Sequence, residues 1–360
     1  MKKTVLLLVV IYVSFLTSSL FAQGKLSGLM FGDYYYNTSR DASINILKNV
    51  ATKGVQDFQA FQFRRIYLTY DNKISKKFKT RVRFEMSNNV IAQNGKFTAN
   101  IKDAYLQWKA FAGQSLVLGL QPTPSFSVSE KYWKYRSLEK TIMDLRKIES
   151  SRDLGVGLKG KLDKKGIFSY WVLIGNGNSN KPETNKYKRY YLQLKISPVK
   201  NLSITLNGDF SPKGNIRNPY LTTTNNLVSN GTFTSSFFIG YKSGQKYSFG
   251  TETFIQSSEN SFNNGASLQN KNSFGISVFG NLKIKENLYL VGRYDFFDPN
   301  TNALSKGDSR NYILAGLDFK VQKQVSIMPN IQIETYETPL SGNNINASVT
   351  GRLTFYYKFL

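Results

Sequence analysis

The sequence has 360 residues and a net charge of +25 at pH 7, and it contains neither histidine nor cysteine. The missing histidine excludes Ser-His and Asp-His catalysis and removes the commonest metal ligand, while a secreted chain of this length needs no disulfides. After residue 22 no apolar run approaches the ~20 residues that a membrane-spanning helix needs, so a helical membrane protein is excluded. A barrel of alternating strands remains compatible with the mean hydropathy of −0.34.

The positive charge has two interpretations. It is either the surface of a lysine-rich protein or the field of an anion-attracting pore, and composition alone does not separate the two. No cofactor, metal ion or nucleic-acid partner is expected.

The N-terminus has the three parts of a secretory signal peptide. Lys2 and Lys3 provide a positive start, residues 5–16 an apolar centre, and Ala22 ends a plausible cleavage site. The alternative is an N-terminal membrane anchor, for which the apolar run is short. We therefore expect residues 1–22 to be removed and residues 23–360 to form the mature chain.

Alternating runs follow from residue 26 onward. In Phe58–Tyr70 the phase changes midway, which predicts a β-bulge near Arg64 and Arg65. The next run, Phe78–Met86, reads FKTRVRFEM and places apolar side chains on one face and charged ones on the other. A fourth strand is predicted over Ile101–Lys109. A soluble sheet would bury such an apolar face, whereas a transmembrane barrel would turn it to lipid.

A long segment without alternation, residues 122–151, interrupts the strands. It is rich in bases and also contains Tyr132, Trp133 and Tyr135. One interpretation is a loop that folds into the barrel and narrows it, and the other is a solvated surface loop with a helical turn. The aromatic residues favour the inward loop, because an exposed loop has no use for them.

Strand pairs then continue to the C-terminus, and the connections between strands alternate between short and long. About sixteen strands in total, with short turns on one rim and long loops on the other, are typical of an outer-membrane barrel. The last strand alternates through Leu353, Phe355, Tyr357 and Phe359 and resembles the C-terminal assembly signal of such barrels. The predicted fold is a single all-β transmembrane antiparallel barrel with short periplasmic turns and long outer loops.

If apolar side chains face outward, the lumen receives charges of both signs. The inward bases would be Arg81, Arg83, Lys159, Lys161, Arg189, Lys195, Arg293 and Arg352. The inward acids would be Glu85, Asp103, Asp209, Glu252, Asp295, Asp318 and Glu334. A local cationic ladder is possible, but each base can instead pair with a neighbouring acid of the wall.

Several motifs resemble the phosphate-selective porin O and P family. They are FQFRRIYLTYDNKISKKFKTRVRFEM, DAYLQW, LVLGLQPTPSF, SEKYWKYRSLEKT and SSRDLGVGLKG, within about residues 58–180. The resemblance implies a sixteen-stranded, usually trimeric outer-membrane channel with a basic ladder in the lumen and basic residues at an inward-folded constriction. Membership does not by itself imply that phosphate is the solute.

Two groups of residues are therefore expected to form the functional site. The pore-lining basic ladder would contain Arg64, Arg65, Lys79, Arg81, Arg83, Lys159 and Lys161. The constriction loop, residues 122–151, would contribute Lys131, Trp133, Lys134, Tyr135, Arg136 and Lys140.

The expected function is passive diffusion of small hydrophilic solutes through the outer membrane, with a preference for anions such as phosphate or phosphorylated and carboxylated nutrients. The alternatives are an unselective diffusion porin and, from another class, a barrel without transport that serves as a secretion scaffold or surface-interaction protein. An enzyme is not expected, because no histidine, persuasive carboxylate pair or phosphate-binding glycine loop is present. The expected partners are outer-membrane lipid, small anionic solutes and, by resemblance, two further copies of the chain.

Overall fold

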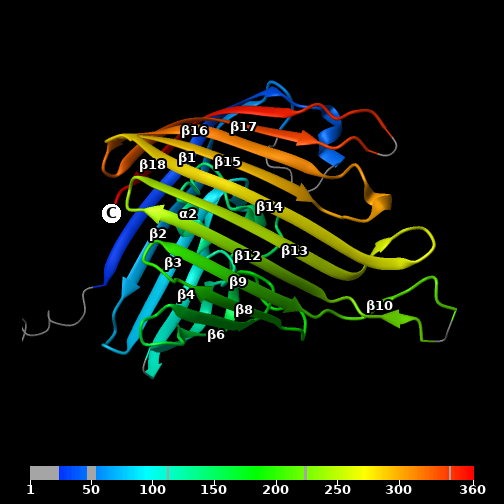
Figure 1. The fold of residues 1–360 in the computed structure, drawn as a ribbon, viewed down its shortest axis with the longest axis horizontal. Helices are drawn as coiled ribbons and strands as arrows, with labels where there is room; N and C mark the ends of the chain where they lie inside the picture. Colours follow the sequence, from blue (N-terminus) through cyan, green and yellow to red (C-terminus); the bar gives the residue numbers. More distant parts are fainter. Residues whose placement is uncertain (1–23, 47–53, 112, 223–224, 340–341) are drawn as a thin grey trace, which may run out of the picture.

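The computed structural model describes residues 24–46, 54–111, 113–222, 225–339 and 342–360. The expected signal peptide lies outside these residues. In the described part of the chain, sixteen strands form one closed antiparallel barrel, in which the first strand pairs with the last (Figure 1). The all-β barrel predicted from the sequence is confirmed.

The barrel strands follow one another around the wall, each paired with its neighbours in sequence. Their bounds are β1 (Lys25–Ser39), β2 (Gln59–Asn72), β3 (Phe78–Ile91), β4 (Phe97–Phe111), β5 (Gln114–Pro122), β6 (Arg152–Lys161), β7 (Phe168–Gly175), β8 (Arg189–Ile196), β9 (Leu202–Ser211), β12 (Thr232–Ser243), β13 (Tyr247–Asn263), β14 (Leu268–Lys285), β15 (Leu288–Asp298), β16 (Arg310–Gln322), β17 (Val325–Tyr336) and β18 (Ser348–Lys358).

Short elements occupy the connections. They are the two-residue strands β10 (Ile216–Arg217) and β11 (Leu227–Val228), the helices α2 (Ser129–Trp133) and α3 (Ile142–Leu145), and the 3-10 turns η2 (Ala42–Ile46) and η3 (Ala303–Ser305). Among the described residues, no helix is both long and apolar enough to cross a membrane.

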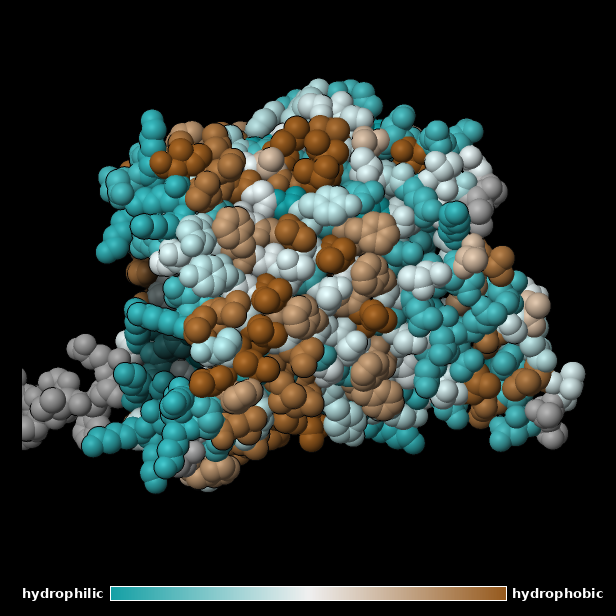
Figure 2. Space-filling model, viewed as in Figure 1, coloured by the Kyte–Doolittle hydropathy of each residue, from teal (hydrophilic) through white to brown (hydrophobic). Residues whose placement is uncertain are grey.

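Side chains alternate between the two faces of the wall. In β3, Phe84 is 41% exposed on the outside, whereas the adjacent Glu85 is 5% exposed on the inside. The same rule places Arg81 and Arg83 inside. Figure 2 shows the result on one face of the molecule: apolar side chains cover the middle of the barrel, and hydrophilic ones gather at both ends.

A β-bulge interrupts β2 at the predicted place. Phe31 of β1 pairs with Arg65, but the next residue, Gly32, pairs with Phe63, so Arg64 has no opposite partner in β1. Strict alternation would put two consecutive residues on opposite faces. The bulge instead lets Arg64 and Arg65 both reach acids of the interior. The extra residue shifts the inward–outward alternation of the strand by one position.

The two rims of the barrel differ. Seven short turns lie at one rim, on the left of Figure 1, and we call it the short-turn rim. The start of β1 and the end of β18 lie at the same rim. The other rim carries the longer connections. Two outer connections, residues 92–96 and 264–267, are nevertheless short, because the strands themselves extend further; β4 begins at Phe97 instead of the predicted Ile101.

Candidate functional site

The predicted constriction loop, residues 122–151, starts at the last residue of β5, ends just before β6 and lies inside the barrel. Its residues Val128, Tyr132, Trp133, Tyr135 and Leu138 form a buried cluster with inward side chains of the wall. Those wall residues come from β12, β14, β15, β16 and β17: Phe238, Phe279, Val291, Tyr312, Leu314 and Met328. Apolar burial of this kind is the main force that holds the segment against one side of the lumen.

A second apolar cluster is formed by segment residues on either side of the first cluster in sequence. Phe126, Ile142, Met143 and Ile148 pack against inward residues of β13 and β15, namely Phe254 and Phe297. The middle of the segment is thus held by the first cluster and both of its ends by the second.

Polar contacts complete the attachment. Trp133 is fully buried, and its indole Nε1–H donates to the backbone oxygen of Glu139 at 2.6 Å. The hydroxyl of Tyr135 donates to Asp318 on β16 at 3.0 Å. Arg146 forms an ion pair of 2.5 Å with Glu334 on β17, and both side chains are fully buried. Trp133, expected in the constriction loop, is therefore an anchor in the packed interface between this loop and the wall.

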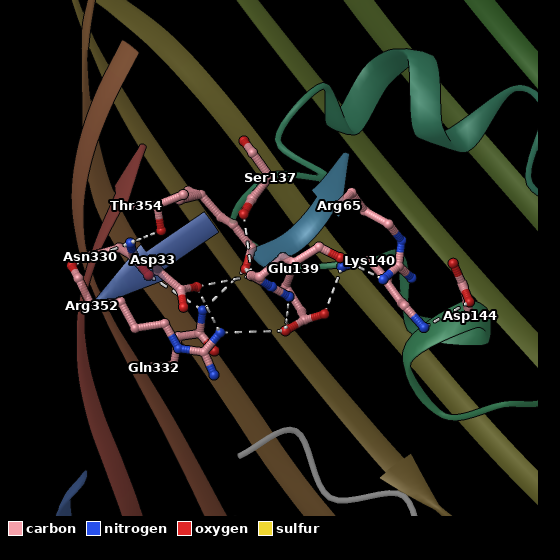
Figure 3. A network of polar contacts seen from close by, with 12 residues as sticks. Asp33, Arg65, Ser137, Glu139, Lys140, Asp144, Asn330, Gln332, Arg352 and Thr354 are labelled. Atoms are coloured by element: carbon pink, nitrogen blue, oxygen red, sulfur yellow. Dashed lines mark hydrogen bonds and ion pairs between the residues drawn. The ribbon is translucent and has the colours of Figure 1, made fainter. Parts of the chain in front are cut away.

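A four-residue ionic network joins the segment to the neighbouring strands β1, β2 and β18. Arg64 Nη2 lies 2.8 Å from Glu139 Oε2 and its Nη1 lies 3.8 Å from Asp33 Oδ2. Arg352 Nη1 lies 3.7 Å from Asp33 and 4.0 Å from Glu139. Figure 3 shows Asp33, Glu139 and Arg352 gathered in this network. Two cations thus share two buried acids, so the group is balanced in charge.

The other arginines of the expected ladder also have acidic partners. Arg65 lies 3.4 Å from Glu85, and Arg83 lies 3.2 Å from Asp103. Arg81 binds both carboxylate oxygens of Asp71, at 2.7 and 2.9 Å. A paired guanidinium has less charge to offer a passing anion than a free one, because its field is largely cancelled by its partner.

The lysines of the expected ladder differ from the arginines. Lys159 Nζ stands 4.4 Å from the ring centre of Trp171, and Lys79 precedes Arg81 by two residues on the inward face. Neither has a carboxylate within 4 Å among the described residues. Lys161, the last residue of β6, is exposed at the short-turn rim, beside Gly166 of the following turn.

Within the inward segment, the predicted bases also divide into paired and unpaired groups. Arg136 contacts Glu130 at 3.2 Å and Asp144 at 2.8 Å, and Lys140 contacts Asp144 at 3.3 Å. Lys131 and Lys134 are exposed to the lumen and have no carboxylate within that range in the described part of the chain. Burial, and then repulsion from Lys242 and Lys320, lowers the pKa of Lys134.

The unpaired lysines form one group, which we call the lumen lysine cluster. Each lies near a short turn, on α2 or directly after α2, and their ammonium groups are close enough for repulsion between neighbours. Two members, Lys195 on β8 and Lys242 on β12, were not in the expected ladder. The cluster consists of Lys79, Lys131, Lys134, Lys159, Lys195 and Lys242.

Three cavities surround the inward segment. Two, of about 330 and 700 Å³, lie towards the long loops, and both include Arg65 and Lys140. The third, of about 630 Å³, lies towards the short turns and includes Lys134. Arg136 lines all three, so this side chain stands where the cavities approach one another.

Besides Lys242, sequence reasoning missed further inward bases, among them Lys102 and Arg152. Lys102 lies 3.1 Å from Glu85, and Arg152 binds Asp103 through its Nε. A second bulge, in β4, explains Lys102: Arg83 pairs with Asp103 while the next residue, Phe84, pairs with Ile101. Alternation gave no signal for Arg152, because the residue directly before the inward Asp153 is expected on the outer face.

Comparison with known proteins identifies the family. The model of the family "Phosphate-selective porin O and P" matches residues 43–231, more than half of the chain. The chain belongs to this family. No curated protein matches the sequence.

Solved structures share the fold of this porin at low sequence identity. The outer-membrane channel DcaP of Acinetobacter baumannii has a TM-score of 0.68 at 14% identity, covering 94% of this chain and 98% of that one. An anion-selective porin from Comamonas acidovorans has a TM-score of 0.63 at 10% identity, covering 94% and 100%. OmpT of Vibrio cholerae in its trimer form has a TM-score of 0.62 at 13% identity, also covering 94% and 100%.

The protein is therefore an outer-membrane porin, a channel and not an enzyme. The barrel provides the membrane passage, and residues 122–151 lie inside it.

Proposed function

We propose that this porin passes small hydrophilic solutes by diffusion and prefers anions. The supporting observation is the lumen lysine cluster, whose ammonium groups have no carboxylate partner among the described residues. By Coulomb's law in water, one unit charge about 7 Å from an ion changes its energy by about 0.6 kcal/mol, or roughly threefold in local concentration. Several such lysines at one level give a clear preference at low salt, and salt above ~0.1 M screens it.

Phosphate and carboxylates are the proposed solutes. The family carries phosphate in its name, and one barrel of the same fold is described as anion-selective. Lysine ammonium groups attract such anions as mobile point charges and hold them weakly, as conduction requires. Segment 122–151 is proposed to narrow the passage, with Arg136 at its centre. The paired arginines of the ladder would shape the wall more than they attract solute.

The test is the zero-current potential of the mature protein in planar bilayers under a potassium chloride gradient, followed by titration of phosphate as a blocker of chloride current. Wild type should be anion-selective and blocked by phosphate. The variant Lys131→Gln/Lys159→Gln/Lys195→Gln should lose most of the preference.

A matched control removes a paired cation without changing the net charge. Arg81→Gln/Asp71→Asn should leave the potential unchanged if the lysines set selectivity. An unselective wild type would establish a general diffusion porin. A folded protein without conductance would contradict transport and favour a scaffold or surface-interaction role.

We also infer that the porin is a homotrimer. The support is the trimer form of Vibrio cholerae OmpT, which shares the fold. The mass of the detergent-solubilised protein, measured by light scattering with the detergent contribution subtracted, tests this; a monomeric mass would contradict it.

A further inference from the structure

The apolar outer surface extends to the very end of the barrel at the short-turn rim. Leu162 lies directly after β6 and is 63% exposed, and Val321, the second-last residue of β16, is 59% exposed. Ile284 near the end of β14 and Phe359 after β18 are also exposed. Lipid hydrocarbon can therefore contact the wall up to the last residues before the turns.

The opposite rim is different. The outer part of β13, residues 256–263, reads QSSENSFN, and β14 begins LQNKNS. The strands there continue beyond the apolar band as polar hairpins, on the right of Figure 1. Cations of the long loops consequently lie away from the edge of the apolar band, whereas any cation in a short turn lies directly beside it.

Exposed lysines occupy that position. They lie in or directly beside six of the seven short turns, and Figure 2 shows hydrophilic side chains next to apolar ones along this rim. Representative members, which we call the rim lysines, are Lys76, Lys164, Lys165, Lys200, Lys285 and Lys323. They are distinct from the lumen lysine cluster, because they lie in the turns or, in the case of Lys285, at the last strand residue before a turn.

Three acids of this rim have hydrogen-bond or ion-pair partners other than the rim lysines among the described residues. Asp163 accepts hydrogen bonds from the backbone N–H groups of Ile167 and Phe168 within its own turn. Asp71 is bound to Arg81, and Glu286 is bound to Lys283. The exposed lysines outnumber these acids, so the rim carries a net positive charge beside the exposed apolar side chains.

We propose that this rim binds the headgroups of anionic phospholipids in the leaflet that surrounds it. A lysine whose neighbours contact hydrocarbon places its ammonium group at the depth of the lipid phosphates. Binding of a soluble acidic protein would not require exposed apolar side chains between the lysines of this rim. Their presence therefore favours lipid over such a protein as the partner. The inference does not rest on the proposed anion preference, since the lumen takes no part in it.

The test measures lipid selectivity directly. The mature porin is reconstituted in phosphatidylcholine vesicles, and EPR compares the association of spin-labelled phosphatidylglycerol with that of spin-labelled phosphatidylcholine. Each lysine near an anionic surface contributes up to about fivefold to association at low salt. Wild type should therefore favour phosphatidylglycerol at low salt, and the preference should fall steeply in ~1 M salt, where the Debye length is about 3 Å.

Two four-lysine variants separate this rim from general charge. Lys164→Gln/Lys165→Gln/Lys200→Gln/Lys323→Gln should lose most of the preference. The matched control, Lys96→Gln/Lys181→Gln/Lys186→Gln/Lys306→Gln, removes the same charge from the outer loops and should retain it. Equal association of both lipids with wild type at low salt would overturn the proposal, as would loss of the preference in the control alone. If the rim variant does not fold, the lipid preference of the wild type at low and at high salt still tests the proposal.

Discussion

Arg64 on β2 holds Glu139 of the inward segment, with Nη2 and Oε2 2.8 Å apart. The two residues are distant in sequence, and the β-bulge at Arg64 is what lets this side chain reach the segment. Burial alone would raise the pKa of Glu139, but Arg64 and then Arg352 overcome that effect and lower it. The carboxylate therefore stays ionised inside the barrel because two guanidinium groups stabilise it.

Replacement of Arg64 by alanine should destabilise the porin. Breaking one side of a buried ion pair costs roughly 3–5 kcal/mol, and here we expect the lower end because Arg352 remains 4.0 Å from Glu139. Urea unfolding of the protein in lipid vesicles, followed by tryptophan fluorescence, measures the change.

Adding Glu139→Gln to Arg64→Ala should recover part of the loss, since no unpaired buried charge then remains. Additive effects of the two substitutions would contradict the direct coupling.

Trp133 should hold the inward segment in the lumen. The ring is fully buried, lies 5.4 Å from that of Phe279 and donates to the Glu139 backbone. Trp133→Ala should cost about 3–5 kcal/mol, as large-to-small core substitutions do. A loosened segment would also widen the passage, so single-channel conductance should rise and become noisier.

The neighbouring Lys134, which is exposed, provides the control. Lys134→Ala should leave stability nearly unchanged. Unaltered conductance in Trp133→Ala, despite lower stability, would show that segment 122–151 does not limit the flow of ions.

Alternation explains why the barrel could be predicted from the sequence. In a wall surrounded by lipid, every second side chain of a strand faces hydrocarbon and is apolar. Phe84, which is exposed on the outside, and Glu85, which is buried on the inside, show this alternation in two consecutive residues. The bulge at Arg64 was predictable for the same reason, because the flanking phenylalanines and aliphatic residues are out of phase. Lys102 was missed because its bulge falls at the edge of the predicted strand, where no phase conflict is visible.

The partners of the inward charges could not be predicted. Periodicity gives the face of Arg83 but not that Asp103 lies beside it, because that contact depends on the register of β3 against β4. The packing of Trp133 against Phe279 of β14 likewise depends on the path of the segment through the lumen. A basic ladder and a charge-balanced wall have the same sequence pattern, and only the pairing distinguishes them.

The end of the inward segment should respond to pH through Glu149. Its side chain is buried, accepts a hydrogen bond from the Ser125 hydroxyl at 2.6 Å, and shares its site with Asp209. Burial first, and then the charge of Asp209, raises the pKa of Glu149, while Arg189 acts in the opposite direction. The folded protein therefore binds a proton here that the unfolded chain releases at a pH of about 4.3.

The sign of the effect follows from this difference. Below the unfolded pKa, Glu149 is neutral in both states and the site is at its most stable. As the pH rises from there to the raised folded pKa, the unfolded chain gains free energy from ionisation that the folded protein does not, so stability falls. Glu149→Gln keeps the size of the side chain and cannot ionise, so it should flatten this part of the profile. The measurement is the thermal unfolding midpoint in detergent between pH 4 and 9, taken by circular dichroism.

Glu183→Gln is the matched control, because Glu183 lies in an outer loop where backbone N–H groups and Lys188 lower its pKa. Its contribution is complete above the unfolded pKa and is lost only as the pH falls further, so the control should keep the wild-type slope between pH 5 and 9. If Glu149→Gln also kept that slope, the proton would not reside on Glu149 in the folded porin. Glu149 lies close to β6, where the segment rejoins the wall. A flattened slope with unchanged conductance in Glu149→Gln would therefore place the proton-sensitive contact at this end of the segment and not in the solute passage.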